Sequence, residues 1–310
     1  MKVLVTCPPM LGMIEEFRNI FVNGGIELTT PDVVQTMTKG ELMDLVPEHH
    51  GWIIGDDLAD AQVLKAGAEG KLKAAVRWGV GIDNVDVEAC NDLGISFCNT
   101  PAVFGDEVAD IAVSYLIALA RQTFYIDRML RGGEWIKPRG VSLSGKNAAL
   151  IGYGDVGKRI AKRMISMGIK VNIYDPAYQT IEDEGHIELL KWPNKIGVAD
   201  FVVIACALTD RNYHLLNSTV FEMLKPGVKI INVSRGPIID EKALISNLKS
   251  GKIHSVALDV FEEEPLPTES YLLSHPLCIL GSHNASNTDE AVRKASEVAI
   301  QKLFEFLNIK

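Results

Sequence analysis

Short apolar runs alternate with helix-like stretches through the first hundred residues. The apolar runs are four or five residues long, and apolar positions between them recur at three- and four-residue steps. Such alternation is typical of a parallel sheet with helices on both faces. Strands are expected at 2–6, 26–29, 52–55, 74–78 and 95–98, with helices near 12–23, 39–46, 58–68 and 85–92.

A second series of the same kind begins after residue 145. The segment 201–207 is apolar throughout, as expected of a strand that is covered on both faces. The last helix is predicted over 288–308 and is capped by Asn287 or Thr288. The strands of this series are expected at 148–151, 169–174, 201–206, 229–233, 255–260 and 277–281.

One long helix and one irregular segment are predicted between the two series. Thr100-Pro101 interrupts the alternation, and a helix is expected over 106–121. This helix is apolar on most sides, so we expect it to be buried, both between domains and at a subunit interface. Residues 122–145, with Trp135, are expected to be irregular, as an arm on a partner subunit or as a surface loop. The 106–145 region is therefore the predicted contact of a homodimer.

A glycine-rich turn joins the first strand of the second series to the helix after it. Gly152 permits a tight turn, Gly154 leaves the backbone open to a pyrophosphate, and Gly157 lets the helix pack closely. The helix N-terminus offers unpaired N–H groups and a positive dipole end to the phosphates. Asp175 ends the next predicted strand about 20 residues further on. Its carboxylate can bind both ribose hydroxyls and repels a 2′-phosphate, so the motif predicts NAD rather than NADP.

An earlier glycine-rich turn follows the fourth strand, with the sequence Arg77-Trp-Gly-Val-Gly-Ile-Asp-Asn-Val-Asp. Its backbone N–H groups could hold a small anion. The alternative is a plain connection between a strand and a helix.

Composition narrows the class of protein. A chain of 310 residues with 47% apolar side chains is long enough for two domains. Its formal charge of −9 argues against nucleic acid or an anionic membrane as a partner. The apolar stretches fall short of the roughly 20 residues of a membrane span, and the start lacks the apolar region of a signal peptide. Five scattered cysteines without a Cys-x-x-Cys pair are typical of reduced thiols in a cytoplasmic protein, and no metal site is expected.

Three late strands of the second series are each followed by a notable polar side chain. Arg235 follows one strand, the three glutamates at 262–264 follow the next, and His283 follows the last. Ligands of open parallel sheets bind outside the carboxyl ends of the strands. Each side chain alone could be an ordinary surface or loop residue. A cation, a carboxylate and an imidazole at three equivalent strand ends together predict an active site.

These motifs resemble those of the D-2-hydroxyacid dehydrogenases, the phosphoglycerate dehydrogenase-like group. They run in the order and spacing of that family over nearly the whole chain. The matching segments are Arg77-Trp-Gly-Val-Gly-Ile-Asp-Asn-Val-Asp, Asn99-Thr-Pro, Gly152-Tyr-Gly-Asp-Val-Gly, Tyr174-Asp-Pro, Asn232-Val-Ser-Arg-Gly-Pro, Ala257-Leu-Asp-Val-Phe-Glu-Glu-Glu-Pro and Ser282-His-Asn-Ala-Ser.

The resemblance implies a role for each member of the predicted active site. Arg235 binds the substrate carboxylate and the C2 oxygen, His283 is the general acid/base, and Glu264 is its partner. The chemistry is consistent, because removing a hydroxyl proton needs a base poised near neutral pH. A carboxylate beside the imidazole fixes its tautomer and stabilises the charged form. A guanidinium matches a carboxylate in a two-point fork.

The resemblance also implies a binding site for the substrate carboxylate and a set of cofactor residues. Val80 and Gly81 form the turn that takes the carboxylate, and Asp259 holds the nicotinamide carboxamide. The implied NAD-binding residues are Gly152, Gly154, Asp155, Val156, Gly157, Asp175, Cys206, Ala207, Val233, Ser234, Asp259 and Ala285.

The implied fold is α/β with two doubly wound parallel-sheet domains. A Rossmann NAD-binding domain, residues 99–286, is inserted into a flavodoxin-like substrate domain formed by residues 1–98 and 287–310. The cleft between the domains is expected to hold the substrate and to close over it. Because the chain stops at residue 310, an appended regulatory domain is not expected.

Departures from the family pattern bear on the substrate. Members that use phosphoglycerate tend to carry arginine after the third strand, where this chain has Asp56-Asp57. Acids that face a phosphate repel it unless Lys137 or Arg139 compensates, so a substrate with a neutral or cationic tail is expected. The departures expected to tune the fit of the cofactor are Ser282 in place of proline and Ala205-Cys206-Ala207 in place of His/Thr-Pro.

The predicted function is hydride transfer between nicotinamide and a D-2-hydroxy acid or 2-oxo acid. The alternative is an NAD-sensing binding protein of the co-repressor type, which would have an exposed partner groove and negligible turnover. The retained Arg235, Glu264 and His283 weigh against that alternative. The Glu–His pair also disfavours decarboxylating or formate-type chemistry on the same fold.

Overall fold

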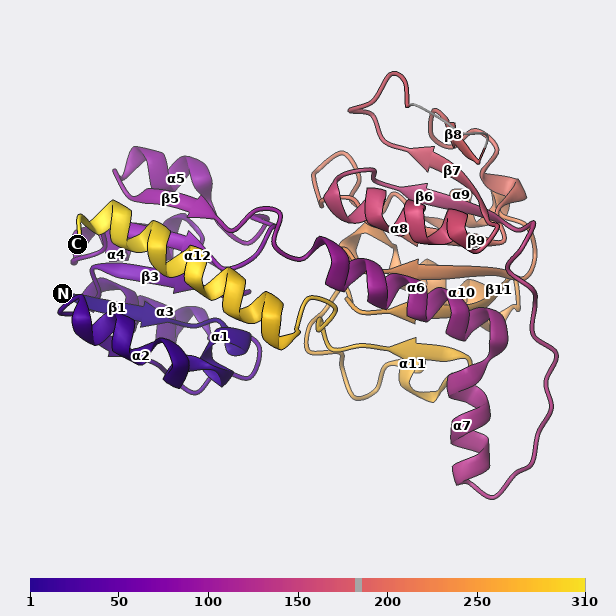
Figure 1. Ribbon diagram of the computed structural model, residues 1–310, viewed down its shortest axis with the longest axis horizontal. Coiled ribbons are helices and arrows are strands. Elements are labelled where there is room, and N and C mark those ends of the chain that lie inside the picture. Colours follow the sequence, from indigo (N-terminus) through magenta and orange to yellow (C-terminus); the bar gives the residue numbers. More distant parts are fainter. Residues whose placement is uncertain (182–185, 310) are drawn as a thin grey trace. The chain divides into compact units, whose positions relative to one another are not determined.

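The computed structural model describes residues 1–181 and 186–309. By its internal contacts the chain forms two compact units, one of Met1–Phe104 with Asn287–Lys310 and one of Gly105–Ser286. Each unit has its own parallel β-sheet (Figure 1), so the predicted α/β fold with two parallel sheets is confirmed. Residues 99–104, which the sequence predicts in the second domain, belong by their contacts to the first unit.

The first unit has the flavodoxin-like strand order. Within its described residues the sheet has five parallel strands in the order β2-β1-β3-β4-β5. Trp52 on β3 is fully buried and lies in a core with Leu4 and Leu64. The strands are β1 (Lys2–Val5), β2 (Glu27–Thr29), β3 (Gly51–Ile54), β4 (Ala74–Arg77) and β5 (Ser96–Asn99). The helices are α1 (Pro8–Gly12), α2 (Ile14–Asn23), α3 (Lys39–Leu45), α4 (Ala61–Glu69), α5 (Val87–Asp92) and α12 (Asp289–Leu307).

Polar side chains determine where several of these helices begin. Thr38 and Glu41 form a capping box at the start of α3, in which each side chain accepts from the other residue's backbone N–H. Asp60 accepts from the first-turn N–H groups of α4 at 3.0 Å. Thr288, one of the two predicted caps, accepts from the N–H of Ala291 at 3.2 Å. The last helix therefore begins at Asp289.

The second unit has the Rossmann strand order extended by one strand. Within its described residues the sheet has seven parallel strands in the order β12-β11-β10-β9-β6-β7-β8. The chain order reverses between β6 and β9, which is where such sheets bind ligands. The strands are β6 (Asn147–Ile151), β7 (Lys170–Tyr174), β8 (Ile187–Leu189), β9 (Phe201–Ile204), β10 (Val228–Asn232), β11 (Ile253–Leu258) and β12 (Cys278–Leu280). The helices are α6 (Gly105–Arg121), α7 (Thr123–Arg131), α8 (Asp155–Ser166), α9 (Ser218–Met223), α10 (Glu241–Lys249) and α11 (Tyr271–Ser274).

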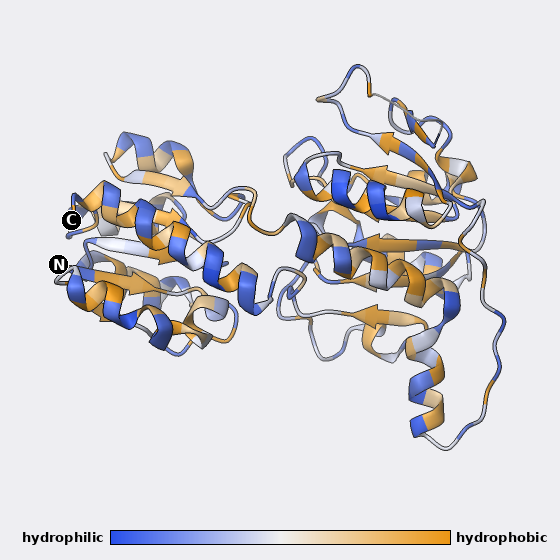
Figure 2. Cartoon of the chain, in the orientation of Figure 1, coloured by the Kyte–Doolittle hydropathy of each residue, from blue (hydrophilic) through white to orange (hydrophobic). Residues whose placement is uncertain are grey.

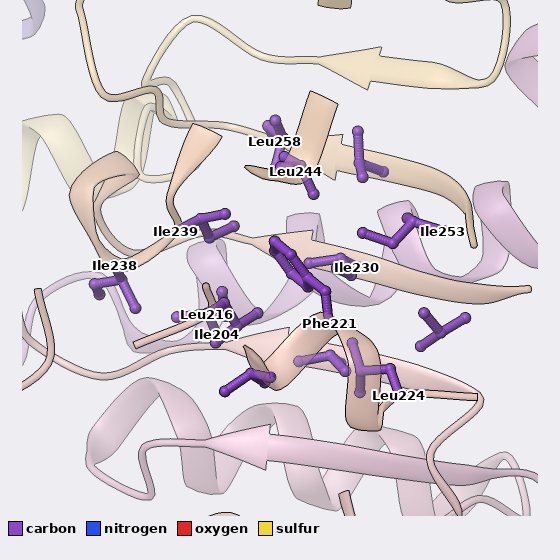
Figure 3. Packing of buried hydrophobic residues seen from close by; sticks show 14 of the residues in the cluster. Ile204, Leu216, Phe221, Leu224, Ile230, Ile238, Ile239, Leu244, Ile253 and Leu258 are labelled. Carbon is purple, nitrogen blue, oxygen red and sulfur yellow. The ribbon is translucent and has the colours of Figure 1, made fainter. Parts of the chain in front are cut away.

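Buried aliphatic side chains hold the second unit together. Phe221 of α9 is fully buried and lies between Leu224, Leu216 and the strand residue Ile230 (Figure 3). The strands of this sheet are largely hydrophobic, whereas α8 has a hydrophilic outer face (Figure 2). This core keeps the strand ends in fixed positions, and the polar side chains discussed below lie at those ends.

The prediction that residues 122–145 are irregular is wrong for about the first third of the segment. Residues Thr123–Arg131 form helix α7, which extends away from the sheet of its unit before the chain returns to β6 (Figure 1). None of its residues is buried. The apolar side chains of this helix therefore do not pack into a core of the same chain. A prediction that looks for the pattern of a buried helix does not find it.

Some features of the described residues bear on the class of protein. None of the described helices has the length and hydropathy of a membrane span. The cysteines at 7, 90, 98, 206 and 278 are all free thiols. In the described part of the chain, no group of three or more histidine, cysteine or acidic side chains is placed to hold a metal ion.

Candidate active site

The glycine-rich turn at the end of β6 has the geometry that a dinucleotide needs. Gly152 has φ +97°, and a Cβ there would lie 2.6 Å from the Cα of Cys206. A Cβ on Gly157 would lie 2.2 Å from the carbonyl oxygen of Gly152, so α8 and β6 approach closely only because both residues are glycine. Gly154, in contrast, has open space where a side chain would be. The three glycines therefore shape the turn and leave its outer side accessible.

The N-terminus of α8 is open toward the same place. Gly154 is its N-cap and supplies no side-chain oxygen to the first-turn N–H groups. Those N–H groups need acceptors, and a pyrophosphate supplies them. Asp155 is exposed and is turned to Arg159, with Oδ1 3.1 Å from Nε. Val156, the other predicted residue of this turn, is half-buried.

Asp175 lies directly after β7 and faces the glycine turn. One carboxylate oxygen accepts from the N–H of Tyr153 at 2.7 Å, and the other from the N–H of Ala177 at 2.9 Å. A carboxylate offers about four acceptor positions, so capacity remains for ribose hydroxyls. The residues of the turn and Asp175 thus fit NAD in shape and in charge.

The chain after β9 and the chain after β10 meet beside this turn. The hydroxyl of Ser234 donates to the carbonyl of Cys206. Val233 is buried, whereas Ala207 is exposed. Burial raises the pKa of the Cys206 thiol to about 11, so it stays protonated near neutral pH. These four predicted cofactor residues therefore place small, uncharged side chains beside the glycine turn.

Arg235 is held by the turn that follows β10. The buried side chain of Asn232 donates to the carbonyl of Arg235 at 2.9 Å and accepts from the N–H of Ser234 at 3.0 Å. Gly236 comes next, and a Cβ there would lie 1.8 Å from the backbone carbon of Phe261. The turn that carries the guanidinium is therefore pressed against the loop that carries the glutamates.

Glu264 and His283 are in direct contact. Nδ1 of His283 lies 2.8 Å from Oε2 of Glu264, and the two side chains have equal exposure of 22%. The other oxygen of Glu264 accepts from the N–H of Phe261 at 2.9 Å. Because β10, β11 and β12 are adjacent and parallel, the residues after them share one edge of the sheet. The structure thus brings together the carboxylate and the imidazole that the sequence predicts as a pair.

Asp259 follows β11 and is almost fully buried at 2% exposure. Its carboxylate accepts from the N–H groups of Asn284 and Ala285 at 3.2 and 2.8 Å. Burial raises the pKa of Asp259, and these two backbone donors act against that shift. The residue therefore anchors the loop of His283, a contact that the sequence does not predict.

In the first unit, Val80 and Gly81 lie in the turn after β4. Thr100 and Asn99 hold this turn, with the Thr100 hydroxyl accepting from the N–H of Gly79 at 2.8 Å and Asn99 donating to the carbonyl of Val80 at 2.7 Å. Among the hydrogen bonds of the described residues, none uses the N–H of Val80 or Gly81. Val80 is half exposed. The turn can therefore offer backbone donors to an anion.

Asp56 and Asp57 do not lie as the sequence predicts, because only one of them is accessible. Asp57 is fully buried and accepts from the N–H of Met37 at 2.8 Å and from the hydroxyl of Thr6. Asp56 lies 2.6 Å from the guanidinium of Arg77, whose side chain is only 6% exposed. The cation at this sheet edge is therefore already paired, and Asp57 faces inward to satisfy backbone and hydroxyl donors.

The structure contains a second imidazole–carboxylate pair, which the sequence does not predict. His214 contacts Glu262, which lies two residues before Glu264 in the same loop. The N–H of Glu241 donates to Glu262 at 3.3 Å, and the N–H of Glu262 donates to Glu241 at the same distance. These contacts hold the loop that carries the three glutamates in place. A histidine in a loop without sequence periodicity carries no signal from which this pair could be predicted.

Fold and site together define a dinucleotide-binding α/β protein with two parallel-sheet units. The family model for the D-isomer specific 2-hydroxyacid dehydrogenase, NAD binding domain, matches residues 113–285. A hydroxypyruvate reductase from Thermotoga maritima is 34% identical over 88% of this chain and 90% of the relative. A D-3-phosphoglycerate dehydrogenase from Methanocaldococcus jannaschii is 32% identical over 99% of this chain but only 57% of the relative. The apo structure of D-lactate dehydrogenase from Escherichia coli superimposes with a TM-score of 0.82 at 26% identity, covering 99% of this chain and 97% of the other.

The chain therefore belongs to the D-isomer specific 2-hydroxyacid dehydrogenase family. Its activity is the NAD-dependent interconversion of a 2-hydroxy acid and a 2-oxo acid. The predicted family, cofactor and reaction class are confirmed.

Proposed function

We propose that His283, Glu264 and Arg235 carry out this reaction on a small 2-oxo acid whose tail is neutral or cationic. The observation that carries the proposal is the 2.8 Å contact between His283 Nδ1 and Glu264 Oε2. An ionised carboxylate only accepts hydrogen bonds, so it keeps the proton on Nδ1 and leaves Nε2 to exchange a proton with the substrate oxygen. Bound NAD supplies the hydride acceptor in the oxidation, and NADH the hydride donor in the reduction.

Arg235 orients the substrate in this proposal. Its guanidinium can bind the carboxylate and the C2 oxygen of a 2-oxo acid in a two-point fork. The Asn232 contacts that fix the Arg235 turn support such a role, because a positioned cation loses less freedom on binding. We assign the carboxylate contact in the first unit to the N–H groups of Val80 and Gly81.

The cofactor roles are proposed on the same basis. Gly152, Gly154 and Gly157 form the turn, the first N–H groups of α8 hold the pyrophosphate, and Asp175 binds the ribose. Asp259 holds the carboxamide, as the resemblance implies. The remaining proposed contacts are Asp155, Val156, Cys206, Ala207, Val233, Ser234 and Ala285.

The charges at the edge of the first sheet support a substrate whose tail carries no negative charge. Arg77 is 6% exposed and paired with Asp56 at 2.6 Å, so it is not available to a phosphate. A substrate such as hydroxypyruvate or glyoxylate needs no further cation. We therefore expect 3-phosphohydroxypyruvate to be a poor substrate.

We also propose that the chain forms a homodimer through the 106–145 region. Ile117, Phe124 and Trp135 are exposed by 39%, 45% and 78%. Ile117 and Phe124 line a surface hollow of about 480 Å³, which is also bordered by Asp110 of α6 and Arg163 of α8. An apolar helix face that lacks cover in its own chain supports a second copy as its partner. Location in the cytoplasm stays a prediction.

A panel of 2-oxo acids with NADH tests the function directly. Loss of absorbance of the reduced cofactor should identify a substrate with a short tail that is neutral or cationic. With that substrate, His283→Ala should lower kcat by about 10²- to 10⁴-fold, the usual contribution of general acid–base catalysis. NADH binding should be unchanged within a factor of about three, because the histidine does not form the glycine turn.

A matched control comes from the second imidazole–carboxylate pair. His214→Gln removes an imidazole from Glu262 in the same unit and should keep turnover within about threefold of the unmodified protein. Full turnover by His283→Ala with every active substrate would refute the assigned role. A large loss in His214→Gln alone would move the role to the other pair.

A further inference from the structure

The turn after β4 is built around a buried guanidinium. Arg77 is the last residue of β4, and its side chain is only 6% exposed. The guanidinium donates to the carbonyl of Trp78 and, from Nε, to Oδ1 of Asn84 at 3.1 Å. Trp78 and Asn84 are the two ends of the segment that contains Val80 and Gly81. One side chain therefore joins both ends of the turn in the first unit.

The same guanidinium restricts the backbone inside the turn. Gly79 has φ +142°, and a Cβ there would lie 2.6 Å from Nη1 of Arg77. The backbone approaches the cation this closely only because residue 79 is glycine. The N–H of Gly79 donates to the Thr100 hydroxyl at 2.8 Å, and its carbonyl accepts from the N–H of Thr100 at 3.1 Å. Contacts with Arg77 and Thr100 thus fix the residue directly before Val80.

Asp56 and Asn84 orient the guanidinium in turn. Oδ1 of Asp56 accepts from Nη2 of Arg77 at 2.6 Å. The side-chain amide of Asn84 donates to the carbonyls of Gly55 and Asp57 at 3.1 and 2.7 Å, so its oxygen is held toward Arg77. A planar guanidinium has donors in several fixed directions and matches such a set of acceptors, whereas an ammonium is a point charge. Because Asp56 offsets the charge of Arg77, we expect Arg77 to act on the turn by its geometry.

The directions of the next two N–H groups follow from the planarity of the peptide bond. In a trans peptide the C=O and the following N–H point in opposite directions. The carbonyl of Gly79 is bonded to the N–H of Thr100, so the N–H of Val80 points away from Thr100. The carbonyl of Val80 accepts from Asn99 at 2.7 Å, so the N–H of Gly81 points away from Asn99. Three successive peptide planes are thus fixed, and the Arg77 contact with the Trp78 carbonyl fixes the first of them.

We propose that Arg77 is a positioning residue for the substrate carboxylate, acting through the turn whose N–H groups at Val80 and Gly81 bind it. The proposal rests on the assignment of the carboxylate to this turn under the proposed function. Without the Arg77 contacts, the peptide between Trp78 and Gly79 loses one of its two hydrogen bonds, and the two N–H groups no longer converge on one anion. Arg77 thus contributes to the affinity for the 2-oxo acid and not to the transfer of hydride or proton.

Arg77→Lys tests the proposal in the protein loaded with NADH. Lysine keeps the positive charge beside Asp56, but a single ammonium cannot bond Trp78 and Asn84 at the same time in the geometry of the fork. The KM for the 2-oxo acid should rise about tenfold, as expected for the loss of a hydrogen bond to a charged group. The kcat at saturating substrate should stay within about threefold. The dissociation constant of oxamate, which carries a carboxylate next to a carbonyl, should rise by the same factor as KM.

Arg293→Lys is the matched control, since it changes another arginine of the same unit, whose ion pair with Glu16 is exposed. It should leave KM and the dissociation constant of oxamate unchanged. Amide hydrogen exchange gives a readout that does not depend on turnover. The N–H of Gly79, which is bonded to Thr100, should exchange about tenfold faster in Arg77→Lys than in the unmodified protein or the control.

An unchanged KM and unchanged oxamate binding in folded Arg77→Lys would overturn the proposal, as would a loss confined to kcat. Should that variant fail to fold, Asn84→Ala removes the acceptor of Nε at the far end of the turn. It should raise KM with little change in kcat, and an unchanged KM would again overturn the proposal.

Two further results separate this inference from the proposed function. In the unmodified protein with NADH, oxamate should slow the exchange of the N–H groups of Val80 and Gly81. Absence of that protection would defeat the assignment of the carboxylate to the turn, and the role of Arg77 with it. A catalytically silent His283→Ala would defeat the proposed role of the histidine and leave the effect of Arg77→Lys on oxamate binding as it is.

Discussion

Two carboxylates of the predicted site, those of Asp175 and Asp259, hold the backbone around them. Asp175 accepts from the N–H of Tyr153 inside the glycine turn, so the ribose-binding candidate also fixes the turn. Asp259 does the same for the loop of His283. A carboxylate has enough lone pairs for both tasks, and the protein N–H groups orient it before a ligand arrives. Replacing such a residue removes a hydrogen-bond acceptor of the backbone as well as the proposed ligand contact.

Asp175→Ala should weaken NADH binding by about tenfold and narrow the preference over NADPH. In its proposed role the carboxylate accepts from ribose hydroxyls and repels a 2′-phosphate, so its loss should weaken the binding of NADH more than that of NADPH. Fluorescence titration with NADH and with NADPH gives both dissociation constants. Asp127→Ala, which removes an exposed carboxylate on α7, is the control and should change neither. An unchanged ratio of the two constants in Asp175→Ala contradicts the assignment.

At the scale of elements, strand ends and helix starts are positioned by close backbone contacts. Gly157 allows α8 to lie against the end of β6, and Gly236 allows the turn of Arg235 to lie against the loop of Glu264. Both contacts depend on the absence of a side chain. The geometry of the site therefore depends on these two glycines as well as on its charged residues.

Gly157→Ala should destabilise the second unit and weaken NADH binding. The added Cβ would lie 2.2 Å from the carbonyl oxygen of Gly152, so α8 must move away from β6. Overpacking of this kind costs about 1–3 kcal/mol of unfolding free energy, which urea denaturation can measure. Gly40→Ala on α3 is the control, because nothing lies within 4 Å of its Cβ position. Gly40→Ala should leave the free energy of unfolding unchanged or raise it slightly. Equal free energies of unfolding for the two variants would contradict the close contact at Gly157.

At the scale of the whole molecule, the chain forms two units with separate cores. The strand orders of the two sheets are those of a flavodoxin-like and a Rossmann-like fold. In the second unit, α7 has no buried residue and the arm after it carries the exposed Trp135. These features lie outside any core of the same chain, and the proposed dimer gives them a partner.

Sedimentation at micromolar concentration should give twice the monomer mass of 34.0 kDa. Phe124→Lys should shift the distribution toward the monomer, because a charge would enter the proposed apolar interface. Val22→Lys changes another exposed apolar residue, on α2, and should leave the mass unchanged. A monomer in the unmodified protein would remove the dimer proposal.

Much of the fold follows from local patterns in the sequence. Strand positions such as the one expected at 201–206 are visible because buried parallel strands are continuous apolar runs. Helix α7 and strand β8 were not predicted, since neither has the burial pattern of a core element. Among the site residues, Arg235, Glu264 and His283 could be found because each follows a strand end in a motif. His214 could not, because its contact with Glu262 joins residues that are far apart along the chain.

The sequence by itself determined the class of each unit, the glycine turn and the chemical types at the strand ends, because periodicity and glycine spacing act over a few residues. Only the tertiary structure decided which side chains touch. It paired His283 with Glu264, turned Asp57 inward and brought the carboxylate of Asp259 to the N–H of Ala285. Such contacts join residues that are far apart along the chain, and their geometry arises only when the strands are packed side by side.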